Sequence, residues 1–182
     1  MVPFPVYLCQ MKHRLQQLDR FLFQRVSIAP LVVFRLVFGS LLLYSTLRTW
    51  QQGWIYDLYL EPTYHFGFFS WLQPLSGDGM YYVYAVLALS AVGIILGLFY
   101  RLSTLTFFLL FAYCELLDKT NYLNHYYLVT LLLFWLLLVP AHRLYSLDSL
   151  LFPKIKSTSC ANWQVLVFKV QLSIVCFFAG LA

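Results

Sequence analysis

A short polar segment lies between two long apolar stretches in the second half of the chain. Residues 118–125 contain Asp118, Lys119, Asn121, Asn124 and His125. Ionisable side chains in or beside a membrane are costly and are usually kept for function. Apolar surroundings disfavour the charged form of a lysine, and a neutral amine is a general base. The segment therefore predicts a base, with Asn and His side chains nearby that are able to orient a hydroxyl or an oxyanion.

A structural interpretation of the same residues stays open. Asp118 and Asn121 belong to types that cap helix ends, and Asp118 beside Lys119 could form a simple ion pair. The positive-inside trend does not explain Lys119, because the loop charges described below place it on the outer side. We therefore favour a functional lysine over a structural one. If one helix continued through the segment, Asp118 and His125 would share a face, and so would Glu115 and Lys119.

The composition is that of an integral membrane protein. The 182 residues are 62% hydrophobic and only 10% charged, and the mean hydropathy is +0.74. A soluble domain of this size cannot hide so much apolar surface, because small domains leave much of their area exposed. The net charge of +5 indicates topology and not a nucleic-acid surface, because the basic residues cluster at span ends. The cysteines have neither paired nor metal-ligand spacing, so we expect no disulfide framework and no metal site.

The apolar runs predict an all-α, multi-pass transmembrane helical bundle with about five spans, since a span needs about 20 apolar residues. The spans cover roughly residues 28–47, 80–100, 102–117, 124–140 and 163–182. Residues 1–27 form a cytoplasmic segment whose basic amphipathic helix, residues 6–24, lies on the membrane surface. Residues 28–182 form the transmembrane domain. Its last run ends without a helix stop signal, so we expect a longer parent protein.

Loop charges predict a cytoplasmic N-terminus and an outer C-terminus. The N-terminal segment and the 140–162 loop are basic, whereas the 48–79 loop holds one arginine and three acidic residues. The basic residues assigned to the inner side are Lys12, Arg14, Arg20, Arg25, Arg101, Arg143, Lys154 and Lys156. The segment with Lys119 then lies at the outer face, lumenal or periplasmic. The membrane would be the inner membrane of a bacterium or the endoplasmic reticulum of a eukaryote.

Three further charges lie within or near the ends of spans, namely Arg35, Glu115 and Lys169. For Arg35 and Lys169 we favour structural pairing, helped by snorkelling, over a ligand site. For Glu115 the structural and the functional interpretations are equally supported.

The polar segment resembles a known family. The run LLDKTNYLNHYYL at residues 116–128 is similar to the signature of vitamin K-dependent gamma-carboxylases and of bacterial relatives with a horizontally transferred transmembrane (HTTM) domain. The similarity covers about residues 28–182. Further matching pieces are residues 33–39, 69–75, 97–101, 145–148 and 177–180.

The resemblance implies a reaction. Lys119 would deprotonate vitamin K hydroquinone, and O2 would then add. The strongly basic oxygenated product would take a γ proton from a glutamate side chain, and CO2 would trap the carbanion. The products are gamma-carboxyglutamate and vitamin K epoxide, so the enzyme would be a lyase that forms a carbon–carbon bond without a metal.

The same resemblance assigns site residues and partners. Asn124 and His125 would assist Lys119 in catalysis. The cofactor-binding residues would be Asp118, Asn121, Tyr122, Glu115 and Arg35. The partners would be the lipid bilayer and a glutamate-containing protein or peptide, with no nucleic acid.

The sequence departs from the family in two respects. The family continues with further spans and a soluble outer domain that engages the peptide substrate. The animal enzymes have Trp-Asn-Asn before the histidine where this chain has Tyr122-Leu123-Asn124, so only the second asparagine carries over. Two alternatives stay open: a non-catalytic membrane scaffold or quinone- or lipid-binding module, and, less favoured, a small-molecule transporter. The transporter is weakened by the lack of an inverted repeat.

Overall fold

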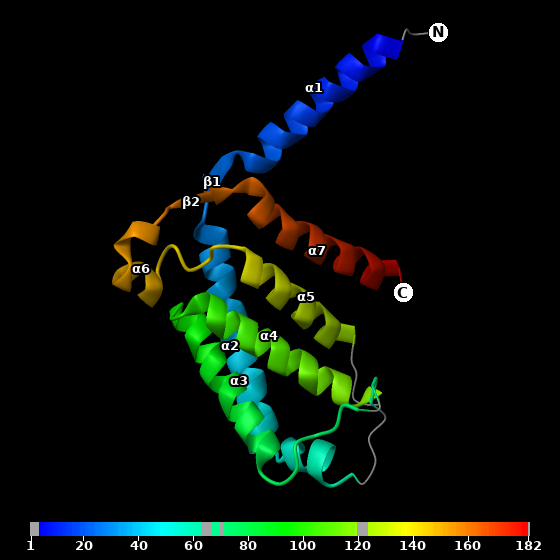
Figure 1. Cartoon of the computed structure of the whole chain (residues 1–182), viewed down its shortest axis with the longest axis vertical. Helices are drawn as coiled ribbons and strands as arrows, with labels where there is room; N and C mark the ends of the chain where they lie inside the picture. The colour runs from blue at the N-terminus through cyan, green and yellow to red at the C-terminus, as the bar shows by residue number, and fades with distance from the viewer. Residues whose placement is uncertain (1–3, 63–66, 70, 120–123, 182) are drawn as a thin grey trace. The chain divides into compact units, whose positions relative to one another are not determined.

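The computed structural model describes residues 4–62, 67–69, 71–119 and 124–181. It is almost entirely helical (Figure 1). The helices are α1 (Phe4–Phe23), α2 (Ala29–Gln51), α3 (Gly79–Leu96), α4 (Tyr100–Leu117), α5 (Asn124–Leu138), α6 (Leu147–Leu151) and α7 (Asn162–Leu181), with a π-helix η1 (Tyr56–Leu60) and a 3₁₀ helix η3 (Pro153–Ile155).

The predicted all-α transmembrane fold is confirmed. Four of the described helices, α2, α3, α4 and α7, are long and apolar enough to cross a membrane, and α5 is a shorter apolar helix. The 15 residues of α5 extend about 22 Å at the usual helical rise, which is less than the roughly 30 Å hydrocarbon layer. About five spans were expected, and the fourth was expected to be short.

Contacts divide the chain into two compact units, residues 1–30 with 157–182 and residues 31–156. The first unit contains α1, α7 and an antiparallel ribbon of β1 (Arg25–Ser27) and β2 (Ser159–Ala161). Its strands are too short to leave an alternating pattern, and the sequence did not predict them.

The ribbon ties the end of α1 to the start of α7. The backbone N–H of Asn162 donates to the carbonyl of Gln24 at 3.0 Å. The Asn162 side-chain amide donates to the carbonyl of Phe21 at 3.1 Å. The amphipathic helix predicted over residues 6–24 is therefore joined to the last helix of the chain by hydrogen bonds.

In the second unit, α3 packs against α4, and α4 against α5 (Figure 1). Buried apolar residues from each helix form the core, among them Leu42, Leu87, Phe107, Leu133 and Leu136. Helix α2 approaches α3 closely at Gly39, where a Cβ would lie 2.9 Å from Cγ1 of Ile95.

Gly97 closes α3 in a left-handed conformation with φ +62°. Its N–H donates to the carbonyl of Ile94 at 3.2 Å, and the N–H of Leu98 donates to that of Gly93 at 2.9 Å. These bonds satisfy the last carbonyls of the helix, as in a Schellman motif. A Cβ at Gly97 would also collide with Nη1 of Arg35 and with Cβ of Ser146.

Arg35 is completely buried and binds the chain that follows α5. Its guanidinium donates to the carbonyl of Ala141 at 3.3 Å and to that of Tyr145 at 2.5 Å. A buried charge is tolerated when hydrogen bonds replace its lost hydration. These contacts give Arg35 a structural role in holding residues 141–145 against α2.

Asp148 caps the N-terminus of α4 from a distant part of the chain. Its carboxylate accepts from the N–H groups of Phe99 at 2.9 Å and Tyr100 at 3.0 Å. Its own N–H donates to the carbonyl of Gly97 at 3.0 Å. A negative charge at a helix N-terminus is stabilised by the free N–H groups and the helix dipole. Arg35, Gly97, Tyr145 and Asp148 together are called the Arg35–Asp148 cluster below.

We expect Gly97→Ala to destabilise the protein more than Gly77→Ala. Gly77 has φ +61° and nothing within 4 Å of an added Cβ, so it shares the backbone strain without the collision. Each variant carries the left-handed penalty of about 1–2 kcal/mol, and overpacking at Gly97 adds about 1–3 kcal/mol. Thermal unfolding in detergent measures the difference. Equal midpoints for the two variants would contradict the packing described at Gly97.

Candidate functional site

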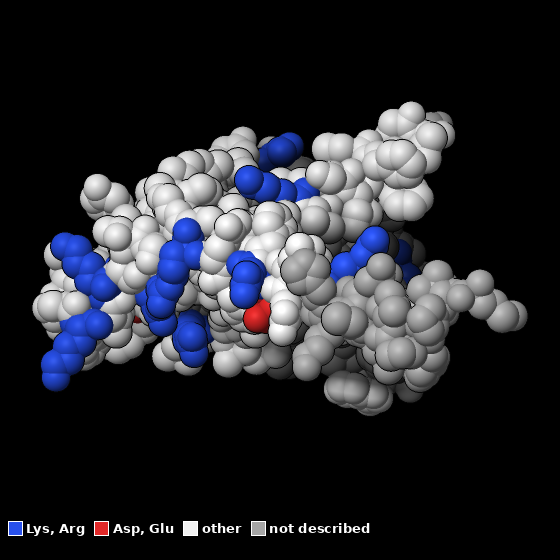
Figure 2. All heavy atoms as spheres, turned by 90° about the horizontal axis from the view of Figure 1, so that it is seen from above, with Lys and Arg blue, Asp and Glu red and all other residues white. Residues whose placement is uncertain are grey.

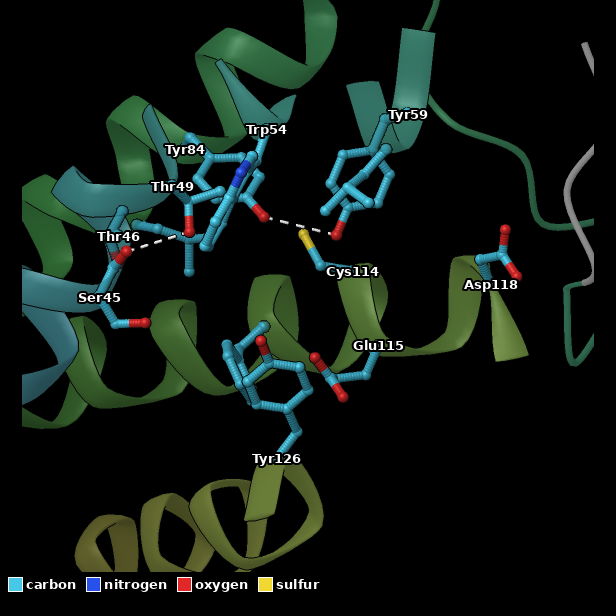
Figure 3. A pocket seen from close by; sticks show the side chains of 13 residues that line it. Ser45, Thr46, Thr49, Trp54, Tyr59, Tyr84, Cys114, Glu115, Asp118 and Tyr126 are labelled. Atoms are coloured by element: carbon cyan, nitrogen blue, oxygen red, sulfur yellow. Dashed lines mark hydrogen bonds between the residues drawn. The ribbon is translucent and has the colours of Figure 1, made fainter. Parts of the chain in front are cut away.

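Two adjoining cavities lie between α2, α4 and α5 in the second unit. The first has a volume of about 370 Å³ and the second of about 300 Å³. These volumes are at the lower end of the range of roughly 300–1,000 Å³ found for small-molecule sites. Residues that line both are Ser45, Thr46, Thr49, Trp54, Phe111 and Tyr126. The first cavity is also lined by Tyr59, Tyr84, Cys114, Glu115 and Asp118 (Figure 3).

Helix α2 presents a polar edge to the cavities. Ser45, Thr46 and Thr49 face them, as the helical repeat allows for positions three and four apart. The Thr46 hydroxyl donates to the carbonyl of Leu42 at 2.8 Å, and the Thr49 hydroxyl donates to that of Ser45 at 3.0 Å. The hydroxyl hydrogens of both threonines are therefore used within α2, and their oxygens remain available as acceptors.

Two tyrosines form a second polar group on the wall of the first cavity. Tyr59 comes from η1 and Tyr84 from α3, and both are buried. The Tyr84 hydroxyl donates to that of Tyr59 at 3.4 Å. Burial, with a smaller effect of Tyr84, raises the pKa of the Tyr59 phenol, so this phenol stays protonated at neutral pH. The Cys114 thiol is directed toward the pair (Figure 3).

Glu115 presents a buried acceptor without a partner. Its carboxyl group is directed toward Tyr126 (Figure 3). Oε2 is buried, and no described residue forms a hydrogen bond with it. Burying an unsatisfied polar atom costs free energy, so such an atom needs an explanation, and a ligand donor is one.

The polar segment that the sequence singled out is not one helix. Helix α4 ends at Leu117, Asp118 has an extended backbone with φ −146°, and α5 begins at Asn124. The condition under which Asp118 and His125, or Glu115 and Lys119, would share a helical face is therefore not met. Asp, Asn and Thr side chains compete for nearby backbone groups, so a run of them favours a helix end over a helix interior.

The break sends the predicted residues to different places. Asp118 lines the first cavity and His125 the second. Asn124 is the first residue of α5, whereas Asn121 and Tyr122 lie outside the described residues.

Lys119 is exposed and is not among the residues that line either cavity. Its Nζ lies 5.2 Å from the ring centroid of Phe68. The backbone N–H of Phe68 donates to the carbonyl of Leu116 at 3.1 Å, which fixes this aromatic ring beside the end of α4. The described residues thus give Lys119 an aromatic contact but not the enclosed apolar setting that the sequence suggested. Its role as a base stays a prediction.

Arg35 lines neither cavity and belongs to the Arg35–Asp148 cluster. The sequence reasoning missed Tyr59, Tyr84 and Cys114. Nothing in the spacing connects the two tyrosines, which lie 25 positions apart. It also missed Ser45, Thr46 and Thr49, although their helical spacing within an apolar span was a usable signal.

A sequence model of the HTTM domain matches residues 23–182. The chain belongs to the HTTM domain family. No solved structure matches the chain. The matched region includes the polar segment and every residue that lines the two cavities. Both cavities therefore lie within the HTTM domain of this chain.

If the buried Glu115 carboxyl is kept for a ligand, its removal should stabilise the ligand-free HTTM domain. We expect Glu115→Met, which keeps a similar shape, to raise the free energy of unfolding by about 1 kcal/mol or more. The matched control is Glu61→Met, because Glu61 is exposed and surface changes usually stay within about 0.5 kcal/mol. Thermal unfolding in detergent compares the two variants. A marked loss of stability in Glu115→Met alone would mean that the carboxyl is structurally required.

Proposed function

We propose that this HTTM domain protein is a vitamin K-dependent gamma-carboxylase-like enzyme that binds vitamin K hydroquinone in the first cavity. The observation that carries the proposal is a buried carboxyl oxygen of Glu115, Oε2, which has no hydrogen-bond partner among the described residues and lies in an aromatic cavity beside the polar segment. Membership of the HTTM domain family and the residues of the segment supply the reaction class.

The residues present suit a hydroquinone head group. Trp54, Tyr59, Phe111 and Tyr126 offer aromatic surfaces to a flat ring. Glu115 offers an acceptor for a ring hydroxyl. The surrounding apolar spans suit a lipid tail that enters from the bilayer. The oxidation of the bound hydroquinone by O2 to the epoxide and water would supply the driving force. This oxidation would drive the replacement of a glutamate γ hydrogen by a carboxylate from CO2.

The residues of the chain then have separate tasks. Lys119 accepts the proton of the hydroquinone hydroxyl, and Asn124 and His125 assist it. Asp118, at the end of α4, orients the lysine segment relative to the first cavity. The apolar walls limit water, which would otherwise quench a strong base.

A second candidate is a quinone- or lipid-binding module without catalysis. One specific observation favours it, because Lys119 is exposed and does not line the first cavity. In that case Lys119 would serve only to place the segment against Phe68.

We expect Lys119→Ala to lower vitamin K epoxide formation by about 100-fold or more, which is the lower end for loss of a general base. The assay supplies the protein in lipid nanodiscs with vitamin K hydroquinone, O2, CO2 and a glutamate-containing peptide, and quantifies the epoxide by chromatography. Lys154→Ala is the control, because Lys154 is an exposed lysine far from the polar segment in sequence. Hydroquinone binding without epoxide formation by the wild type would support the binding module instead.

The charges at the two ends of the second unit support a cytoplasmic N-terminus. The end that carries the α3–α4 turn and α6 holds Arg101, Arg143, Lys154 and Lys156, and the acidic residue there, Asp148, is buried. In Figure 2, Lys and Arg side chains are visible at many points and acidic ones at hardly any. Loops at the other end of the helices are mostly acidic, with Asp57, Glu61, Asp78 and Asp118. Basic loops stay on the cytoplasmic side.

Cysteine labelling tests this orientation. In a background with the native cysteines replaced by alanine, we expect Ser76→Cys to react with a membrane-impermeant maleimide in intact cells or in sealed right-side-out vesicles. Lys154→Cys should react only after the membrane is permeabilised. Both positions are exposed, so reagent access does not depend on unfolding. The reverse pattern would overturn the proposed orientation.

A further inference from the structure

We propose that Glu115 is a specificity-determining residue that makes the first cavity prefer the hydroxyl form of a quinone to its carbonyl form. The inference rests on the proposed function only in taking a quinone-class ligand for the cavity. It does not depend on Lys119 or on the carboxylation reaction.

The chemistry of an isolated carboxylate gives the preference its direction. Oε2 of Glu115 is buried and has no hydrogen-bond partner among the described residues. An ionised carboxylate accepts hydrogen bonds and donates none. A hydroquinone brings two hydroxyl donors, whereas a quinone brings only carbonyl acceptors, which an ionised carboxylate repels, so the two forms are compared at a pH at which Glu115 is ionised.

The rest of the wall reinforces this direction. The hydroxyl hydrogens of Thr46, Thr49 and Tyr84 are already donated to other oxygens. Asp118 adds a second carboxyl group, and the described lining of the first cavity includes no lysine, arginine or histidine. The described lining therefore holds two carboxyl groups and lacks a cation that would attract an anionic ligand such as a fatty acid or a phosphate.

The cavity suits a flat ring in the position that this contact requires. Tyr126 lines the cavity on the side toward which the Glu115 carboxyl group is directed, and Trp54 and Phe111 also line both cavities (Figure 3). A ring among these side chains gains apolar and aromatic contacts in either oxidation state. The aromatic walls thus supply affinity, and Glu115 supplies the discrimination between the two states. A hydrogen bond to a charged group corresponds to a discrimination of roughly ten- to 100-fold.

The test measures binding of both oxidation states of one compound. The probe is 2,3-dimethyl-1,4-naphthoquinone, which has no free quinone ring position to react with the Cys114 thiol. Its hydroquinone is prepared and used without oxygen. Quenching of tryptophan fluorescence in nanodiscs reports binding, and Trp54→Phe shows whether the signal comes from the cavity.

For the wild type we expect tighter binding of the hydroquinone than of the quinone. In Glu115→Gln the ratio of the two affinities should fall about tenfold or more, because an amide donates to a quinone carbonyl as readily as it accepts from a hydroxyl. Glu115→Leu should also lose the preference, while aromatic contacts keep some affinity for both forms. Glu61→Gln is the matched control and should keep the wild-type ratio, since Glu61 is exposed.

The outcomes separate the two proposals. An unchanged affinity ratio in both Glu115 variants, at an unchanged unfolding midpoint, would overturn the role of Glu115, as would equal binding of both forms by the wild type. A ratio that depends on Glu115 without any epoxide formation would remove the carboxylase reaction and leave the specificity role intact.

Discussion

The buried guanidinium of Arg35 is the constraint on which the membrane unit of residues 31–156 depends. A charge without access to water must be matched by acceptors, and here the carbonyls of Ala141 and Tyr145 accept from Nη1 and Nη2, whereas Nε has no partner among the described residues. This requirement brings the chain after α5 back to α2. The returning chain then supplies Asp148, which caps α4 and fixes the turn after α3.

The Arg35–Asp148 cluster also affects the opposite, C-terminal end of α4. Because α4 is capped and packed, we treat it as a rigid helix. The position of its first turn then determines the position of its last turn. That last turn carries Cys114 and Glu115, and Asp118 follows it directly. The Arg35–Asp148 cluster therefore positions the cavity residues without touching a ligand. Three of the sequence pieces that resemble the gamma-carboxylase family, around Arg35, Gly97 and Asp148, meet in this one contact set.

The cavity has features that stability alone would not select. Glu115 keeps a buried oxygen without a described partner, and two tyrosine hydroxyls are buried together. Local departures from good packing and full hydrogen bonding are typical of functional sites. The break between α4 and α5 has a similar character, because it replaces a continuous helix by a polar segment whose first residue, Asp118, lines the cavity. Asp118, the first residue of the segment, is thus part of the cavity wall.

The sequence by itself determined the membrane character, the approximate limits of the spans and the location of the polar segment. These are local properties, because transfer of a side chain from water to lipid depends on its own type and that of its neighbours along the chain. Gly93 and Gly97 show the limit of what such local properties predict. Their spacing suggested one helix-packing motif, yet Gly93 packs against Ser103 whereas Gly97 ends the helix with a positive φ.

Only the tertiary structure decided which polar groups meet. It paired Arg35 with Tyr145, brought Tyr59 to Tyr84 and placed Glu115, and not Lys119, at the wall of the first cavity. Such pairings depend on the rotation of each helix about its axis and on the exact residue at which it ends. A single left-handed glycine or a polar helix end changes both, and hydropathy along the chain does not contain that information.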